Sequence, residues 1–197
     1  MVKIGKRAPD FSTKAFLNGE FKEIKLSEYN GMWIVLFFYQ GDFTLICPTE
    51  LTSIAIRYKE IKKLGAEILA ISVDSVFVHK VWQQEELTKM VERGILYPML
   101  SDPGGKIGRL YGVYDEDKGV NLRGRFIIDP DGVVQSIEIL PFSIGRSVEE
   151  LIRQIEALIH VRKTKGAELC PSNWLPGKGI IMNDPDFVGE ISIIWKP

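Results

Sequence analysis

The chain has two cysteines, Cys47 and Cys170, and the segment around the first is the one best suited to chemistry. Residues 33–50 read WIVLFFYQGDFTLICPTE, in which an unbroken apolar run and a short link precede Cys47 and Pro48. Such a run is typical of a strand buried on both faces, and proline suits the first turn of a helix. Cys47 is therefore predicted at the N-terminus of a helix. Free N–H groups and the helix dipole favour an anion there, so we expect the sulfur to react as a thiolate.

Most unpaired cysteines are small buried hydrophobic residues, so a lone cysteine does not decide between packing and catalysis. The flanking residues favour catalysis, because Thr44 places a hydroxyl three residues before the sulfur and Glu50 a carboxylate three residues after it. The segment Asp42-Phe43-Thr44-x-x-Cys47-Pro48-Thr49-Glu50 resembles the active site of typical two-cysteine peroxiredoxins, close to the alkyl hydroperoxide reductase C branch.

This resemblance extends from Gly5 to about Gly189 and implies an α/β, thioredoxin-like fold with an N-terminal hairpin and a C-terminal extended arm. It implies a thiol peroxidase that reduces hydrogen peroxide and organic hydroperoxides through a Cys47 sulfenic acid, with no metal, haem or flavin of its own. The implied electron donor is a thioredoxin-like protein or a flavoprotein disulfide reductase. The family also implies a homodimer, often assembled into a ring of dimers such as a decamer.

The resemblance assigns Thr44 to hydrogen bonds with the peroxide and the thiolate, and the residue can also cap the helix that begins near Cys47. A cation is needed to hold the thiolate. The residues alone leave two candidates, Arg123 and Arg125, in the segment LRGRFIID. The resemblance selects Arg123, just before a strand, and leaves Arg125 as a solvated strand residue.

Two further assignments rest on the resemblance. Arg146 aligns with a second family arginine that helps an acidic residue, here Glu50, to orient Arg123; its alternative is a surface charge beside a helix start. Cys170, in ELCPSNW, resembles the resolving cysteine, which implies a disulfide with the partner subunit's Cys47. The sequence leaves open an arm that folds back on its own subunit, and a free thiol without a role.

One position departs from the family pattern. The family usually has Pro-x-x-x-Thr-x-x-Cys, whereas Gln40 stands here at the proline position. The proline normally shields the sulfur and shapes the entry loop. We therefore expect Gln40 to leave the activity intact but to reduce its rate or change the peroxide preference.

The pattern of apolar segments predicts a peroxidase domain over residues 1–165 and an arm over 166–197. Asn18-Gly19 and Asp131-Gly132 are hairpin signals, and an amphipathic stripe predicts a last core helix over 148–159. Four of the ten prolines lie in the final 32 residues, where helical periodicity is lost. Because this arm is also rich in apolar side chains, we expect it to pack on another subunit.

Composition limits the remaining function classes. The net charge of -1 gives no sign of a nucleic-acid or anionic-membrane partner, and the first residues contain no apolar signal core, so a cytoplasmic location is expected. A zinc site built from both cysteines, His79 and His160 is disfavoured, since no two of these residues are close in sequence. The absence of Cys-x-x-Cys disfavours a disulfide oxidoreductase. A holdase chaperone or a peroxide-sensing relay on the same fold is the alternative function.

Overall fold

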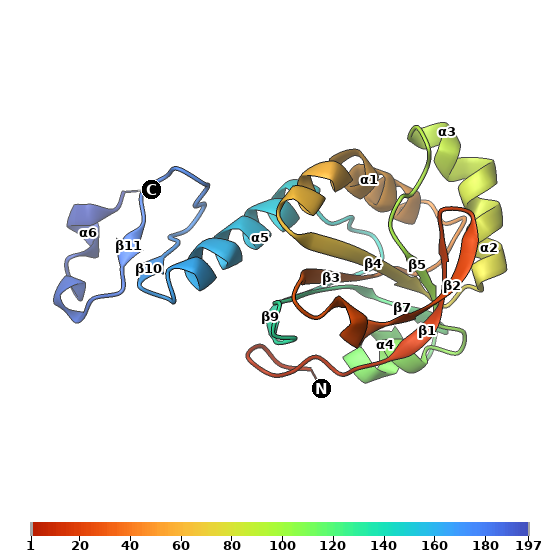
Figure 1. The fold of residues 1–197 in the computed structure, drawn as a ribbon, viewed down its shortest axis with the longest axis horizontal. Coiled ribbons are helices and arrows are strands. Elements are labelled where there is room, and N and C mark those ends of the chain that lie inside the picture. The colour runs from red at the N-terminus through yellow and green to blue at the C-terminus, as the bar shows by residue number, and fades with distance from the viewer. Residues whose placement is uncertain (1, 197) are drawn as a thin grey trace. The chain divides into compact units, whose positions relative to one another are not determined.

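The computed structural model describes residues 2–196, which form two compact units, one ending at Val148 and one beginning at Glu149. The first unit contains a seven-stranded sheet with the order β2-β1-β5-β4-β3-β8-β9 (Figure 1). The strands are β1 (Ser12–Leu17), β2 (Glu20–Lys25), β3 (Trp33–Phe38), β4 (Ala66–Ser72), β5 (Met99–Ser101), β8 (Arg123–Ile128) and β9 (Val134–Leu140).

The α-helices of this unit are α1 (Cys47–Lys63), α2 (Val76–Trp82), α3 (Thr88–Met90) and α4 (Lys106–Tyr111); η1 (Leu26–Tyr29) is a 3-10 helix and η2 (Gln83–Leu87) a π-helix. A separate small hairpin is formed by β6 (Tyr114–Asp115) and β7 (Val120–Asn121). Figure 1 shows α1 and α4 on opposite faces of the sheet. The sheet is therefore covered on both sides, as predicted.

Strand β3 is the central strand that the apolar run predicts, because all six of its residues are buried. It pairs in parallel with β4 and antiparallel with β8. Successive side chains of a strand point to opposite faces. Leu36 and Phe38 pack with Ile107 and Tyr111 of α4, so Phe37 faces the opposite side, which α1 covers.

Both hairpin predictions are confirmed. Asn18 and Gly19 have φ angles of 50° and 86°, and a two-residue hairpin turn of this kind needs two positive values. Residues 131 and 132 join β8 to β9. Strand β8 begins at Arg123 rather than at Arg125, so the arginine expected just before the strand is its first residue.

Helix α5 spans Val148–Lys163, and all of it except Val148 belongs to the second unit. The other elements of this unit are β10 (Glu168–Leu169), β11 (Ile181–Met182), η3 (Pro185–Phe187) and α6 (Ile191–Ile194). The predicted arm is thus not wholly extended, because β10 and β11 pair antiparallel and two short helical segments follow. The boundary between residues 165 and 166 stays a prediction.

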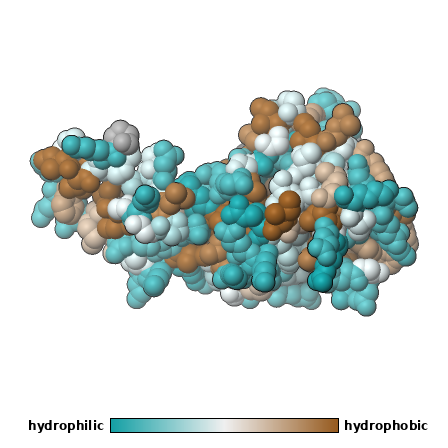
Figure 2. Space-filling view, turned by 90° about the horizontal axis from the view of Figure 1, so that it is seen from above, coloured by the Kyte–Doolittle hydropathy of each residue, from teal (hydrophilic) through white to brown (hydrophobic). Residues whose placement is uncertain are grey.

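Apolar side chains are exposed on the second unit (Figure 2). They are Leu169, Leu175, Met182, Val188, Ile191, Ile193 and Ile194. Val188 reaches 82 % exposure and Ile193 reaches 72 %. Among the described helices, none combines the length and hydropathy that crossing a membrane requires.

Candidate active site

Cys47 is the first residue of α1 and Pro48 is the second, which confirms the predicted helix start. The cysteine exposes 0 % of its surface. Glu50, at the fourth helical position, lies one turn further along the same helix and is 3 % exposed. The sequence therefore places the sulfur and a carboxylate together at the positive end of a 17-residue helix.

Arg123 places a permanent positive charge beside this sulfur. Its Nη1 lies 3.4 Å from Cys47 Sγ and donates to Glu50 Oε2 at 2.6 Å. Its Nε donates to the carbonyl oxygen of Phe142 at 2.9 Å, and the residue is 1 % exposed. The guanidinium is thus held between the sulfur, the carboxylate and the chain that follows β9.

Arg146 completes the network from the other side of Glu50. Its backbone N and its Nε both donate to Glu50 Oε1 at 2.8 Å, and its Nη2 donates to Oε2 at 3.1 Å. Its Nη1 donates to Gly124 O at 2.8 Å, and its guanidinium lies 3.4 Å from the centre of the Phe37 ring. The surface-charge alternative for Arg146 is therefore wrong, because the side chain is buried over the sheet.

Burial and charge act in opposite directions on these groups. Burial opposes ionisation of Glu50, but hydrogen bonds and charge from Arg146, with the charge of Arg123, hold the pKa of the Glu50 carboxyl below its ordinary value. Burial lowers the pKa of the Arg146 guanidinium, and the Glu50 carboxylate opposes that shift. Each buried charge is therefore sustained by its partners.

Strand β8 needs a glycine at position 124, directly after Arg123. A Cβ atom on Gly124 would lie 2.6 Å from Cγ1 of Val113, closer than two carbon atoms can pack. A larger residue would push this part of β8 away and move Arg123, which is next to it in the chain. Gly124 therefore lets the strand hold Arg123 in place while its carbonyl accepts from Arg146.

Thr44 and Arg123 line one hollow of about 440 Å³, together with Gln40, Leu45, Ile46, Phe142 and Ser143. The hydroxyl of Thr44 donates to Gly41 O at 2.9 Å, within the loop. The predicted helix cap is wrong, because the residue before α1 is Ile46 and no side chain caps that end. Thr44 instead shares this hollow with Arg123, whose Nη1 lies 3.4 Å from the sulfur.

The loop that carries Thr44 is anchored by Asp42. This carboxylate accepts from Tyr39 Oη at 2.8 Å and pairs with His79 Nδ1 at 2.7 Å. Burial raises the pKa of Asp42, and the hydrogen bond and charge of His79 oppose that rise. Phe43 has a φ of 54°, a strained left-handed conformation for a bulky residue. The anchored, strained turn fixes where Thr44 stands, and His79 has a structural role as the partner of Asp42.

Arg125 is not the solvated residue that the sequence suggested. Its side chain is 1 % exposed, and its Nη2 lies 3.0 Å from Oε2 of Glu138, its cross-strand partner on β9. Its Nη1 donates to Ser147 O at 3.2 Å. Arg125 is therefore engaged in joining β8 to β9 and to the residue just before α5.

Cys170 follows β10 in the second unit, and its Sγ lies 3.8 Å from Ala157 O of α5. Burial raises the pKa of the Cys170 thiol; Arg153 opposes this shift and Glu168 adds to it. Glu168 also pairs with His160 at 2.7 Å. Cys47 and Cys170 both carry free thiols.

The comparison with known proteins decides the family. A family model described as the AhpC/TSA family matches residues 4–137. The chain belongs to this family. It is 55 % identical over 196 residues to the selenocysteine-containing peroxiredoxin PrxU of Peptoclostridium acidaminophilum, covering 100 % of this chain and 97 % of the relative.

Two further matches agree with this membership. The chain is 41 % identical to alkyl hydroperoxide reductase C of Bacillus subtilis (strain 168), covering 97 % of this chain and 100 % of the relative. The crystal structure of reduced Plasmodium vivax 2-Cys peroxiredoxin superposes with a TM-score of 0.89 at 33 % identity, covering 96 % and 98 % of the two chains. The predicted peroxiredoxin family, thioredoxin-like fold and peroxidase class are confirmed. A peroxidase acts on a peroxide and needs a source of electrons.

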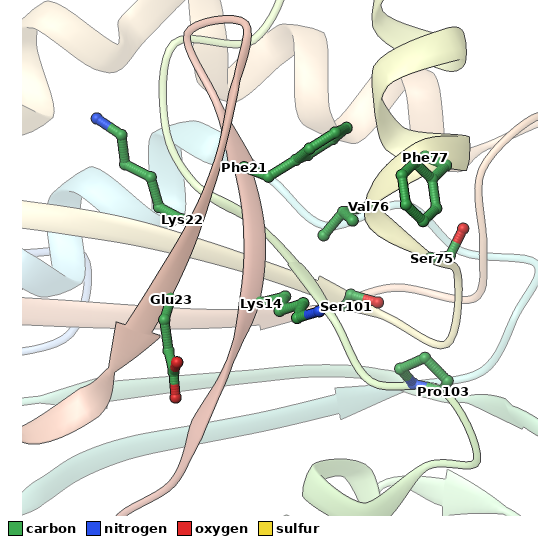
Figure 3. A pocket seen from close by; sticks show the side chains of 9 residues that line it. All are labelled: Lys14, Phe21, Lys22, Glu23, Ser75, Val76, Phe77, Ser101 and Pro103. Carbon is green, nitrogen blue, oxygen red and sulfur yellow. The ribbon is translucent and has the colours of Figure 1, made fainter.

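A second hollow, of about 390 Å³, lies elsewhere in this peroxiredoxin and contains none of the candidate catalytic residues. Figure 3 shows Phe21, Val76 and Phe77 at this hollow, with Ser75 and Ser101 nearby, and the rings of Phe21 and Phe77 pack edge to face with centroids 5.2 Å apart. The hollow of Thr44 and Arg123 is instead the one next to a thiol, because Arg123 Nη1 lies 3.4 Å from Cys47 Sγ. Within residues 2–196, no group of three or more His, Cys, Asp or Glu side chains is arranged to hold a metal ion.

Sequence reasoning missed two partners of Arg123. The carbonyl of Phe142 accepts from its Nε, and Oε1 of Gln40 accepts from its Nη2 at 3.1 Å. No residue-type signal points to a backbone carbonyl. In the sequence, Gln40 stands out only because it occupies the position of the family proline. Its polar side chain, four residues before Thr44, is the one signal of a hydrogen-bonding role.

Proposed function

We propose that this peroxiredoxin reduces peroxides with Cys47 as the nucleophile, and that Arg123 and Thr44 bind the substrate. The proposal rests on one observation above all: Arg123 Nη1 lies 3.4 Å from a sulfur at a helix N-terminus, and Arg123 and Thr44 line the same hollow. Positive charge and free N–H groups together stabilise the thiolate and the negative charge that develops on the leaving oxygen. Glu50 and Arg146 act as positioning residues, because they hold Arg123.

In the first step, the Cys47 thiolate attacks one oxygen of the peroxide and forms an S–O bond as the O–O bond breaks. The leaving oxygen takes the bonding electron pair and a proton and departs as water or an alcohol. The sulfur is thereby oxidised by two electrons to a sulfenic acid. Arg123 can donate to the oxygens throughout, since its guanidinium carries five N–H donors and no acceptor.

In the second step, the sulfur of Cys170 attacks the sulfenic sulfur, and water leaves as the disulfide forms. We propose that this Cys170 belongs to the partner subunit of a homodimer, as in a ring of dimers. The exposed apolar side chains of the second unit support a contact between two copies of the chain, because such a surface is costly to leave in water. A thioredoxin-like protein or a flavoprotein disulfide reductase would then return two electrons. A cytoplasmic location stays a prediction.

Non-reducing electrophoresis after one equivalent of hydrogen peroxide tests the cycle on wild type, Cys47→Ser and Cys170→Ser. A covalent dimer that needs both cysteines is the expected result. A monomer that loses both thiols would show that Cys170 resolves Cys47 within one chain and would refute the intersubunit step. Unchanged thiols in all three proteins would refute the peroxidase proposal itself.

A further inference from the structure

Gln40 makes a contact that a proline at its position could not make. The residue lies two positions after the end of β3, and its Oε1 accepts a hydrogen bond of 3.1 Å from Arg123 Nη2. It also lines the hollow that Thr44 and Arg123 share. A proline side chain has no oxygen and accepts nothing, so the two residues are not equivalent neighbours for a guanidinium.

The five N–H groups of Arg123 can be followed one by one. Nε donates to Phe142 O, and the two on Nη1 face Cys47 Sγ and Glu50 Oε2. One of the two on Nη2 goes to Gln40 Oε1. The second N–H group of Nη2 has no partner within residues 2–196. Because Arg123 lines the hollow, this N–H group is available to a substrate oxygen.

Without Gln40, both N–H groups of Nη2 would lack a protein acceptor. Phe142 and Glu50 would then hold only Nε and Nη1, and Nη2 would be free to tilt into the hollow about the line that joins those two atoms. A neutral amide oxygen stops that tilt without adding a charge. A second carboxylate here would compete with Glu50 and repel the thiolate at short range.

We propose that Gln40 is a positioning residue for Arg123, which fixes the plane of the guanidinium so that one edge meets the sulfur and one N–H group of Nη2 meets the peroxide. This inference rests on the proposed function of Arg123 and Cys47. It differs from the expectation that Gln40 reduces the rate or changes the peroxide preference, because here Gln40 contributes to the rate.

The test uses Gln40→Met, which keeps the length of the side chain but removes the acceptor, and Gln40→Pro, which restores the family residue. Both are made in a Cys170→Ser background, so that only the first oxidation of Cys47 is observed. Stopped-flow measurement gives the rate constant with hydrogen peroxide, and iodoacetamide alkylation of Cys47 gives the reactivity of the thiolate without a peroxide. The matched control is Gln84→Met, because Gln84 is exposed and lies on η2, outside the hollow.

Losing a hydrogen bond to a charged group that acts in the transition state should slow the peroxide reaction by roughly 10-fold in both Gln40 variants. Alkylation should change by less than about 2-fold, since it does not need the substrate N–H of Arg123. Equal loss in both reactions would mean that Gln40 only supports the loop, and unchanged peroxide rates would remove any role; either result overturns the inference. If the Cys170→Ser parent itself fails to react with peroxide, the proposed function falls first.

Discussion

Replacing Glu50 by glutamine is the sharpest test of the charge network. With Cys47 as a thiolate, the site holds two negative charges, on Cys47 and Glu50, and two positive charges, on Arg123 and Arg146. The Glu50 side chain is 2 % exposed, and both arginine side chains are 1 % exposed. Glu50→Gln keeps the shape but removes the carboxylate that both guanidinium groups share.

The cost follows from burial. Removing one member of a buried ion pair typically costs about 3–5 kcal/mol, because it leaves a charge without compensation. For a chain of this size, each kcal/mol shifts the melting temperature by roughly 2–4 °C, so Glu50→Gln should melt roughly 6–20 °C lower. Because Arg123 loses its 2.6 Å anchor, the peroxide rate constant should fall by about 100-fold, the typical cost of a misplaced catalytic group.

Thermal unfolding and stopped-flow oxidation, both on the Cys170→Ser background, measure the two effects. Glu60→Gln is the matched control, since Glu60 pairs with Arg57 at 2.6 Å on the surface with 44 % of its side chain exposed. Exposed pairs contribute about 0–1 kcal/mol, so this control should melt close to the parent. If Glu50→Gln melts within about 2 °C of the parent, or oxidises at the parental rate, the network does not position Arg123 and the reasoning is refuted.

Three further predictions concern pH and the loop. The folded-state pKa of Glu50 is held below its ordinary value. The stability that ionised Glu50 contributes is therefore present above the ordinary pKa and is lost as the pH falls through the folded-state pKa. Urea unfolding at a series of acid pH values should show a loss of stability that Glu50→Gln lacks. Burial raises the pKa of Cys170, so the rate of disulfide formation should keep rising with pH beyond the ordinary pKa of a thiol, and a plateau at or below that pKa in stopped-flow traces would contradict the assignment. His79→Asn leaves the buried Asp42 carboxylate without its imidazole partner, which should cost about 1–3 kcal/mol and speed hydrogen exchange over residues 40–46. Protection equal to that of the parent would show that the pair does not anchor the loop.

The position of Cys47 could be predicted from the sequence because its causes are local. An apolar run long enough for one buried strand precedes it, and Pro48 marks the first turn of the helix. The hairpin at Asn18-Gly19 is local for the same reason, since two adjacent residues with positive φ make the turn. Such features depend on a few neighbouring residues and need no knowledge of the rest of the chain.

The choice between Arg123 and Arg125 could not be made in that way. Both lie on β8, two residues apart, and therefore point to the same face of the sheet. What separates them is the acid that lies opposite: Glu50 arrives from α1, and Glu138 from β9. Only the fold, or a resemblance to a family whose fold is known, brings those partners together.

Gln40 and Thr44 both make contacts near the sulfur that the sequence does not predict. Gln40 and Arg123 are 83 residues apart in sequence, so their hydrogen bond could not be predicted from the missing proline. Thr44 stands at a plausible distance from the helix start, but the turn at Phe43 directs its hydroxyl to Gly41 O instead. Long-range partners and strained turns lie outside what spacing alone can predict.

The most direct test of the account traps the first intermediate. Cys170→Ser protein is treated with one equivalent of hydrogen peroxide and dimedone, which reacts with sulfenic acids, and is then analysed by intact and peptide mass spectrometry. The account predicts one adduct per chain, on Cys47, and none in a Cys47→Ser, Cys170→Ser double variant. Peroxide consumption without an adduct on Cys47, or equal consumption by the double variant, would show that the reacting group lies elsewhere.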